Sequence, residues 1–428
     1  MTVQYIEDRK MKICLVSQDY PPETARGGIG SQTYLKAHGL AALGHEVYVI
    51  SRSTDGQRQE RKDGQSTVIR IPGADDRLPI ATDPVRWLTY SVEVACAVST
   101  LHAAVKLDIV DFPDWGAEGY IHLLNRAEWS RIPTVIQLHG LLVMFAQTMG
   151  WPELNSQLYQ VGTMMEGTCL RLADAVFSSS AYSADWCAKA YGLKRESIPI
   201  LHTGVDTRLF HPWDVPKDRR PTIVYVGRIT QSKGVEQLIE ATCKLAGDFS
   251  GLRLRLIGRG DAHFIERLQS RVRAAALPDL LDFPGFIEHE RLPEQLSRAY
   301  VFAAPSAYEG GPGFVLEAMA CGLPVIGCAG NGAAEVIVPE ENGLLVPPGD
   351  VGALVESLRR FLLNPREREI FGTRARERVL REANSELCIR RLEQVYLAVL
   401  SGKQPQSAKQ KSSSIPHGSA LRGTPTSI

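Results

Sequence analysis

PSAYEGGPGFVLEAMACGLP, residues 305–324, is the stretch that decides most about the fold of this chain. The apolar run before it, 300–304, predicts a strand, and the glycine-rich part then leads into a short helix. Gly310, Gly311 and Gly313 let the backbone approach a ligand closely, and the free N–H groups of a helix start favour an anion such as phosphate. The stretch therefore predicts a strand–loop–helix unit of an α/β protein with an anion site at the start of the helix.

Two carboxylates flank this predicted anion site. Glu309 stands at the entrance of the loop, and Glu317 lies about one turn into the helix. Carboxylate oxygens accept hydrogen bonds from hydroxyl groups, so a phosphate site beside two of them favours a nucleotide sugar as ligand. The alternative is an ordinary strand–helix connection in which both glutamates are solvated.

Apolar strand-like runs alternate with helical stretches along the chain and form two series. The predicted strands are 11–17, 47–51, 68–71, 109–112, 134–138 and 175–178, then 222–226, 252–257, 281–283, 301–304, 324–327 and 343–346. A helix is expected from Tyr34 to Leu43, and the proline- and charge-rich stretch 206–220 between the series is a candidate linker. This βα alternation predicts two Rossmann-like domains with parallel sheets that face a central cleft.

The expected domain boundaries follow from these two series. They are a disordered N-terminus at 1–10, an N-terminal domain at 11–207, a C-terminal domain at 208–386, a last helix at 387–400 and a disordered tail at 401–428. The tail is rich in Ser, Gln, Lys and Pro and cannot bury enough apolar surface to fold. We expect a passive tail, and weak docking of its basic residues to anionic lipid is the alternative.

The composition of the chain argues against several classes of function. The 428 residues include 48 basic and 48 acidic ones, so bulk charge recruits neither nucleic acid nor an anionic membrane. The eight cysteines show no zinc or redox spacing. We find no signal peptide and no apolar run of about 18 residues that would span a bilayer, and we expect a cytoplasmic protein.

Two cations follow the first strand of the second series. Arg228 is the second residue after the strand 222–226, and Lys233 lies near the next helix start. Both can reach a diphosphate, the arginine as a fork and the lysine as a point charge, and would stabilise the charge of a leaving nucleoside diphosphate. The alternative is that both are solvated surface cations.

Two further candidates belong to the first series. Gly27 and Gly28 follow the first strand, but Thr33 occupies the position of the third glycine of a dinucleotide-binding fingerprint. His139 ends the strand 134–138, and ligands bind at strand ends in open α/β sheets. The alternatives are a plain turn for the glycines and a structural role for the histidine.

Glu309 and Glu317 together resemble the Glu-x7-Glu signature of the retaining GT-B glycosyltransferases, in particular family 4. The resemblance extends from about residue 11 to 400. Five more segments carry it: 18–22 with 27–28, 138–140, 204–206, 227–228 with 233–234, and 343–347. The chain departs from the family at Gly311-Pro312, where Phe-Gly is usual.

The resemblance implies a hexosyltransferase of GT-B fold that moves a sugar from a nucleoside-diphosphate sugar to a hydroxyl, with retention and by front-face attack. It implies that His139 and Glu309 contact the transferred sugar, that Glu317 binds the ribose, and that the last helix crosses back to the N-terminal domain. No metal or cofactor is expected, because Arg228 and Lys233 replace a metal. The other donor-binding residues implied are Gly27, Gly28, Gly311, Gly313, Phe314 and Val315.

The acceptor stays open: a sugar, a glycolipid or another small molecule, shaped by 141–145 and the loop after Tyr20. Other functions are also open. A glycoside hydrolase would use paired carboxylates without the cations and glycine loops. A sugar-nucleotide epimerase shares the fold, and a nucleotide-binding scaffold protein would bind without turnover.

Overall fold

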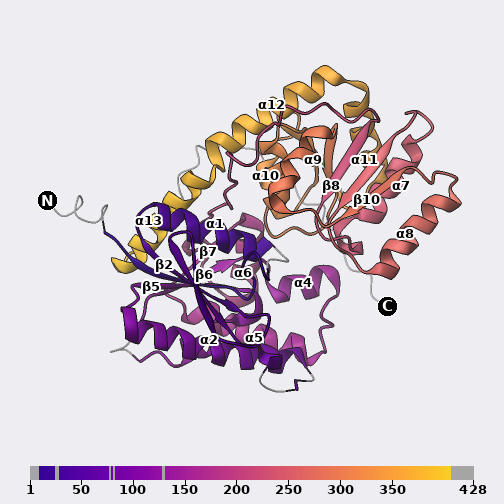
Figure 1. Ribbon diagram of the computed structural model, residues 1–428. Coiled ribbons are helices and arrows are strands. Elements are labelled where there is room, and N and C mark those ends of the chain that lie inside the picture. The colour runs from indigo at the N-terminus through magenta and orange to yellow at the C-terminus, as the bar shows by residue number, and fades with distance from the viewer. Residues whose placement is uncertain (1–8, 25–27, 77–78, 81, 128–130, 406–428) are drawn as a thin grey trace.

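The computed structural model describes residues 9–24, 28–76, 79–80, 82–127 and 131–405. Most of the two termini that we expect to be disordered, 1–10 and 401–428, therefore lies outside the described residues, and so does Gly27. The described chain forms two α/β domains, each built on one sheet (Figure 1).

The N-terminal domain contains a seven-stranded sheet of order β3-β4-β2-β1-β5-β6-β7 among the described residues. All neighbours are parallel except β3 and β4, which form an antiparallel pair. The strands are β1 (Lys12–Val16), β2 (Glu46–Arg52), β3 (Gln59–Asp63), β4 (Ser66–Ile71), β5 (Ile109–Pro113), β6 (Thr134–Leu138) and β7 (Ala175–Ser178). The helices are α1 (Gly28–Ala42), α2 (Asp83–Val105), α3 (Tyr120–Leu124), α4 (Leu142–Met149), α5 (Gln157–Leu172) and α6 (Ala181–Tyr191).

Two elements of this domain differ from the sequence prediction. The edge strand β3 was not predicted, because its sequence QERKD has no apolar residue and its side chains are exposed or half-buried. Helix α1 begins at Gly28 rather than at Tyr34, so Gly28 belongs to the first turn of a helix and not to a loop.

The C-terminal domain contains a parallel six-stranded sheet of order β10-β9-β8-β11-β12-β13 within the described part of the chain. Its strands are β8 (Thr222–Val226), β9 (Arg253–Ile257), β10 (Leu281–Gly285), β11 (Val301–Ala304), β12 (Val325–Cys328) and β13 (Gly343–Val346). Its helices are α7 (Val235–Leu245), α8 (Ala262–Ala274), α9 (Leu292–Arg298), α10 (Gly313–Ala320), α11 (Val351–Leu363) and α12 (Pro365–Glu382).

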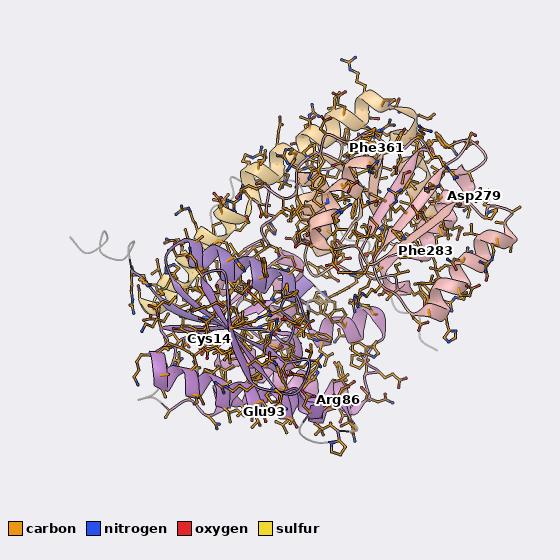
Figure 2. All side chains as sticks on the ribbon, viewed as in Figure 1. Cys14, Arg86, Glu93, Asp279, Phe283 and Phe361 are labelled. Carbon is orange, nitrogen blue, oxygen red and sulfur yellow. The ribbon has the colours of Figure 1, made fainter. Side chains whose placement is uncertain are left out.

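Each sheet lies between layers of helices and is buried on both faces, as continuous apolar strands require. In the N-terminal domain, α2 and α5 cover one face, and α1 with α13 (Ser385–Leu400) covers the other (Figure 1). Figure 2 shows Cys14 in the interior of the N-terminal domain and Phe361 in the C-terminal domain, and both side chains are fully buried. The two domains therefore have separate cores.

The chain crosses between the domains at two points that lie side by side. The Val205 N–H donates to the Ala383 carbonyl, and the Ser385 N–H donates to the Val205 carbonyl, both at 2.9 Å. Helix α13 then packs on the N-terminal domain beside α1 (Figure 1). A buried network fixes it there, because Asp111 of β5 accepts hydrogen bonds from Tyr396 of α13 and, at 2.7 Å, from Lys36 of α1.

By length and composition, α2 is apolar enough to cross a membrane, contrary to the expectation that the chain has no such run. In the structure, Tyr90, Val94 and Val98 on this helix are buried in the core of the N-terminal domain. The apolar character of α2 therefore serves at least in part to fill that core.

Candidate active site between the domains

Both sheets reverse their strand order at one point, and in open α/β sheets ligands bind beyond the carboxyl ends of the strands there. In the C-terminal sheet, the reversal falls between β8 and β11, whose following segments carry Lys233 and Glu309. In the N-terminal sheet it falls between β1 and β5. Lys233 and Glu309, which the sequence predicted as site residues, therefore follow the two strands beyond which the fold predicts a ligand.

Lys233 and Glu309 form an ion pair, with Nζ 2.8 Å from Oε1. Their side chains are 14% and 24% exposed, so the pair is shielded but still open to solvent on one side. The Lys233 Nζ also lies 6.0 Å from the centre of the Tyr308 ring. The sequence assigned these two residues to different parts of a donor, and the structure places them in direct contact.

Arg228 is exposed at the end of β8. Its backbone carbonyl accepts a hydrogen bond from the Tyr225 hydroxyl at 2.8 Å, which fixes the path of the chain after the strand. The guanidinium is thus carried on a fixed backbone at the same strand end as Lys233.

Glu317 lies inside α10, as the sequence predicts. One carboxylate oxygen is 2.9 Å from His289 Nε2, and the other is buried without a hydrogen-bond partner among the described residues. Burial lowers the pKa of His289, but the hydrogen bond and charge of Glu317 outweigh it, so the pKa is raised overall. Glu317 is therefore held in place and keeps one oxygen to accept a hydroxyl.

The glycines of the loop approach the N-terminal domain closely. A Cβ atom on Gly310 would lie 2.2 Å from the His139 carbonyl oxygen, and one on Gly311 would lie 3.0 Å from Ser179 Oγ. A Cβ atom on Gly313, in contrast, would meet none of the described residues within 4 Å. At Gly310 and Gly311 the loop backbone thus lies close to the N-terminal domain rather than to a ligand. Of the three loop glycines, Gly313 is the one with space beside it.

Phe314 and Val315 follow at the start of α10. The Phe314 side chain is 42% exposed, whereas Val315 is buried in the core of the C-terminal domain. Because the Val315 side chain is buried, Val315 can contact a ligand only through its backbone N–H. The first N–H groups of a helix have no partner within the helix.

His139 follows β6 and is partly buried opposite this loop. Burial and the charge of Lys36 lower its pKa to about 3, so the imidazole is neutral at physiological pH. Its Nδ1 atom is buried without a hydrogen-bond partner in the described part of the chain. A neutral imidazole with a free ring nitrogen can bind a sugar hydroxyl.

Asp114, which the sequence reasoning missed, positions His139. Its buried carboxylate accepts hydrogen bonds from the backbone N–H groups of Trp115 at 2.8 Å, His139 at 3.0 Å and Gly140 at 3.1 Å. Burial raises the pKa of Asp114 to about 6, even though these bonds favour its charged form. Asp114 follows β5 directly, so the strand-end rule that selected His139 could have found it too.

Helix α6 joins the two domains at this site. Ser180 and Ser183 donate hydrogen bonds to the Gly310 carbonyl at 2.6 and 3.1 Å. The Glu335 carboxylate, from the C-terminal domain, accepts from the N–H groups of Ala181 and Tyr182 at 2.9 and 2.8 Å. A carboxylate at a helix N-terminus is stabilised by the helix dipole, so Glu335 holds the domains together.

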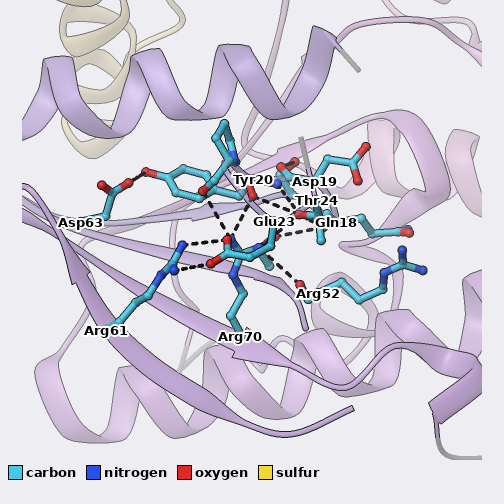
Figure 3. Close-up of polar contacts among 12 residues, drawn as sticks. Gln18, Asp19, Tyr20, Glu23, Thr24, Arg52, Arg61, Asp63 and Arg70 are labelled. Atoms are coloured by element: carbon cyan, nitrogen blue, oxygen red, sulfur yellow. Dashed lines mark hydrogen bonds and ion pairs between the residues drawn. The ribbon is translucent and has the colours of Figure 1, made fainter. Parts of the chain in front are cut away.

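Residues 18–24, between β1 and Gly28, are held by a buried arginine (Figure 3). Arg70 of β4 donates to the Tyr20 carbonyl at 2.9 Å and to Thr24 Oγ1 at 3.1 Å, and pairs with Glu23. Residues 18–24 are therefore anchored, and a Cβ atom on Gly28 would meet none of the described residues within 4 Å.

Models of two protein families match most of the chain. The one described as Glycosyltransferase Family 4 matches residues 26–209, and the one described as Glycosyl transferases group 1 matches residues 208–378. The chain is a GT-B glycosyltransferase of family 4. The resemblance predicted from the motifs is thereby confirmed.

Similar proteins extend over nearly the whole chain. The glycogen synthase of Mycobacterium tuberculosis is 27% identical over 92% of this chain and 97% of its own. A GDP-mannose-dependent alpha-(1-6)-phosphatidylinositol monomannoside mannosyltransferase of Mycolicibacterium smegmatis is 28% identical over 85% of this chain and 92% of its own. Among solved structures, sucrose-phosphate synthase from Thermosynechococcus elongatus superposes with a TM-score of 0.79 at 26% identity, covering 92% of this chain and 100% of that one.

Proposed function

We propose that this glycosyltransferase moves a hexosyl unit from a nucleoside-diphosphate sugar to a hydroxyl acceptor, with retention of the anomeric configuration and without a metal. The observation that carries the proposal is the Lys233–Glu309 pair, which follows the strands at the reversal point of the C-terminal sheet, beside α10. A cation suits the diphosphate and a carboxylate suits the sugar hydroxyls. The names of the relatives, a glycogen synthase and a mannosyltransferase, support a hexose.

Each part of the donor would contact a different group of the site. The free N–H groups at the start of α10, together with Lys233 and Arg228, would hold the diphosphate. The unpartnered oxygen of Glu317 would accept a ribose hydroxyl, and His139 would bind the transferred sugar from the opposite domain.

In the proposed reaction, the bond between the anomeric carbon and the diphosphate breaks, and the acceptor oxygen bonds to that carbon on the same face. The acceptor proton passes to the departing phosphate oxygen. Lys233 and Arg228 stabilise the negative charge that develops on the diphosphate, a type of contact worth about 3–4 kcal/mol in the transition state. These cations are the reason to propose that no metal is needed.

The test is the anomeric configuration of the product, followed by NMR from the first minutes of turnover. Retention is expected, and inversion at the anomeric carbon would refute the mechanism. Release of free sugar at the same rate with and without acceptor would favour a hydrolase, and conversion of the donor alone would favour an epimerase.

A further inference from the structure

Four aromatic rings lead from Glu309 toward the surface of the N-terminal domain. Tyr308 contacts Phe145 of α4 with ring centres 4.6 Å apart, and Phe145 contacts Trp115 at 5.3 Å. Trp115 is stacked with Trp151 at 6.3 Å and an angle of 26° between the rings. The outermost ring, that of Trp151, is 49% exposed.

Tyr308 and Glu118, three residues after Trp115, each carry a buried polar atom without a hydrogen-bond partner among the described residues. The Tyr308 side chain is only 4% exposed, and its hydroxyl lacks a hydrogen-bond partner among the described residues although it lies against Gly140. Glu118, in the turn that begins with Trp115, is 2% exposed and has one bonded oxygen, which accepts from the Gln18 N–H at 3.1 Å. Its other oxygen is without a partner within the described ranges. Buried polar atoms are rarely left unpaired, so these two are suited to hydrogen bonds with a ligand.

The position of these groups in the sheet points to the same use. Trp115 and Glu118 follow β5, and Gln18 follows β1, so all three lie at the reversal point of the N-terminal sheet, where the fold predicts a second ligand. Asp114 links this place to the donor site, because the same carboxylate holds the N–H groups of Trp115 and His139.

Building on the transfer reaction proposed above, we propose that the acceptor is a sugar or cyclitol ring that stacks on Trp115 and Trp151. An aromatic face suits the C–H face of such a ring, and carboxylate and phenol groups suit its hydroxyls. The Glu118 oxygen and the Tyr308 hydroxyl bind the acceptor hydroxyls, with the Tyr308 side next to Glu309 and the transferred sugar.

The charge of the site favours a neutral polyhydroxyl ring over an anionic lipid headgroup. The acidic side chains whose electrostatic influence reaches the Tyr308 hydroxyl include those of Asp114, Glu309 and Glu166. Burial, helped by the charge of the nearby Asp19, raises the pKa of Glu118 to about 8, so added negative charge is unfavourable there. Lys233, beside the Tyr308 ring, is already paired with Glu309.

The experiment uses the full chain saturated with UDP, GDP or ADP, whichever binds by calorimetry. Methyl α-glucoside, methyl α-mannoside and myo-inositol are then tested by saturation-transfer NMR, with sorbitol as the open-chain control. We expect transfer to the ring C–H protons, and affinities about threefold to tenfold weaker in Trp115→Leu and Trp151→Ala at unchanged nucleotide affinity. Leu154→Ala, a 57% exposed neighbour of Trp151 outside the ring stack, is the matched control and should bind like the parent chain.

The possible outcomes distinguish failure of the acceptor site from failure of the proposed function. A chain that binds nucleotide but gives no ring signal, or whose Trp151→Ala variant binds rings as well as the parent, overturns the acceptor site and leaves the proposed function standing. A chain that binds no nucleotide refutes the proposed function, and the acceptor site with it. Sedimentation with phosphatidylinositol-containing vesicles that requires Trp151, without any response to sugars, would replace the ring by a lipid.

Discussion

Separate replacement of Lys233 and Glu309 should affect nucleotide binding differently. In the free protein, Glu309 holds the Lys233 ammonium at 2.8 Å in a shielded position. A hydrogen bond between charged groups of this kind contributes about 1.5–3 kcal/mol. A diphosphate must compete with Glu309 for the Lys233 ammonium, except where another N–H of the same ammonium contacts the diphosphate.

Glu309→Gln keeps the shape of the side chain and releases Lys233. Its affinity for the free nucleoside diphosphate should therefore stay equal or increase, by at most about ten- to hundredfold. Turnover should fall about 10²-fold or more, because a contact to the transferred sugar is lost. Lys233→Ala removes the cation and should weaken nucleotide binding as well as turnover.

Calorimetry with the nucleoside diphosphate on the folded variants measures both effects. Lys244→Ala is the matched control, because Lys244 lies on α7 of the same domain and forms an exposed pair with Glu240. If Glu309→Gln lost as much nucleotide affinity as Lys233→Ala, Glu309 would belong to the diphosphate site and the proposed division of roles would be wrong.

Three further predictions concern the metal, the domain contact and a histidine. Turnover should be undiminished in excess chelator, and loss of activity that magnesium or manganese restores would contradict the proposed role of the cations. Glu335→Gln should weaken the hold on the Ala181 and Tyr182 N–H groups by about 1–2 kcal/mol, and the radius of gyration in small-angle scattering should increase. The pKa of His289 is raised overall by Glu317, so the stability it contributes should be complete below about pH 6.5 and lost as the pH rises through the raised value. The difference in unfolding free energy between the parent chain and His289→Gln should accordingly be larger near about pH 6 than near about pH 8, and an increase with pH would refute the pairing.

The sequence predicted the parts of the fold that depend on local pattern. Continuous apolar runs such as 222–226 identified strands buried on both faces, and Glu317 fell inside α10 as expected. The pattern failed where burial is one-sided or absent. The polar edge strand β3 pairs only with β4, and the first turn of α1 contains two glycines, which disfavour a helix when judged alone.

The sequence also named the candidate residues of the donor site, because phosphate and hydroxyl chemistry require particular side chains at strand ends. It could not show their partners. Lys233 and Glu309 are 76 residues apart and meet only because β8 and β11 are neighbours in the sheet. Strand order is decided by long-range packing, which no local pattern records.

Contacts between the domains were the least visible from the sequence. Gly310 resembles a ligand-binding glycine, yet in the structure its carbonyl is bound by Ser180 and Ser183, about 130 residues earlier. Asp114 stands at a strand end that the strand-end rule could have selected, whereas His289 has no distinguishing neighbours in the sequence. Each becomes part of the site by bonding a predicted residue, His139 or Glu317. The sequence by itself determined which chemical groups and which secondary structure this glycosyltransferase has. Only the tertiary structure decided which of those groups meet, because folding brings together segments whose separation along the chain says nothing of their distance in space.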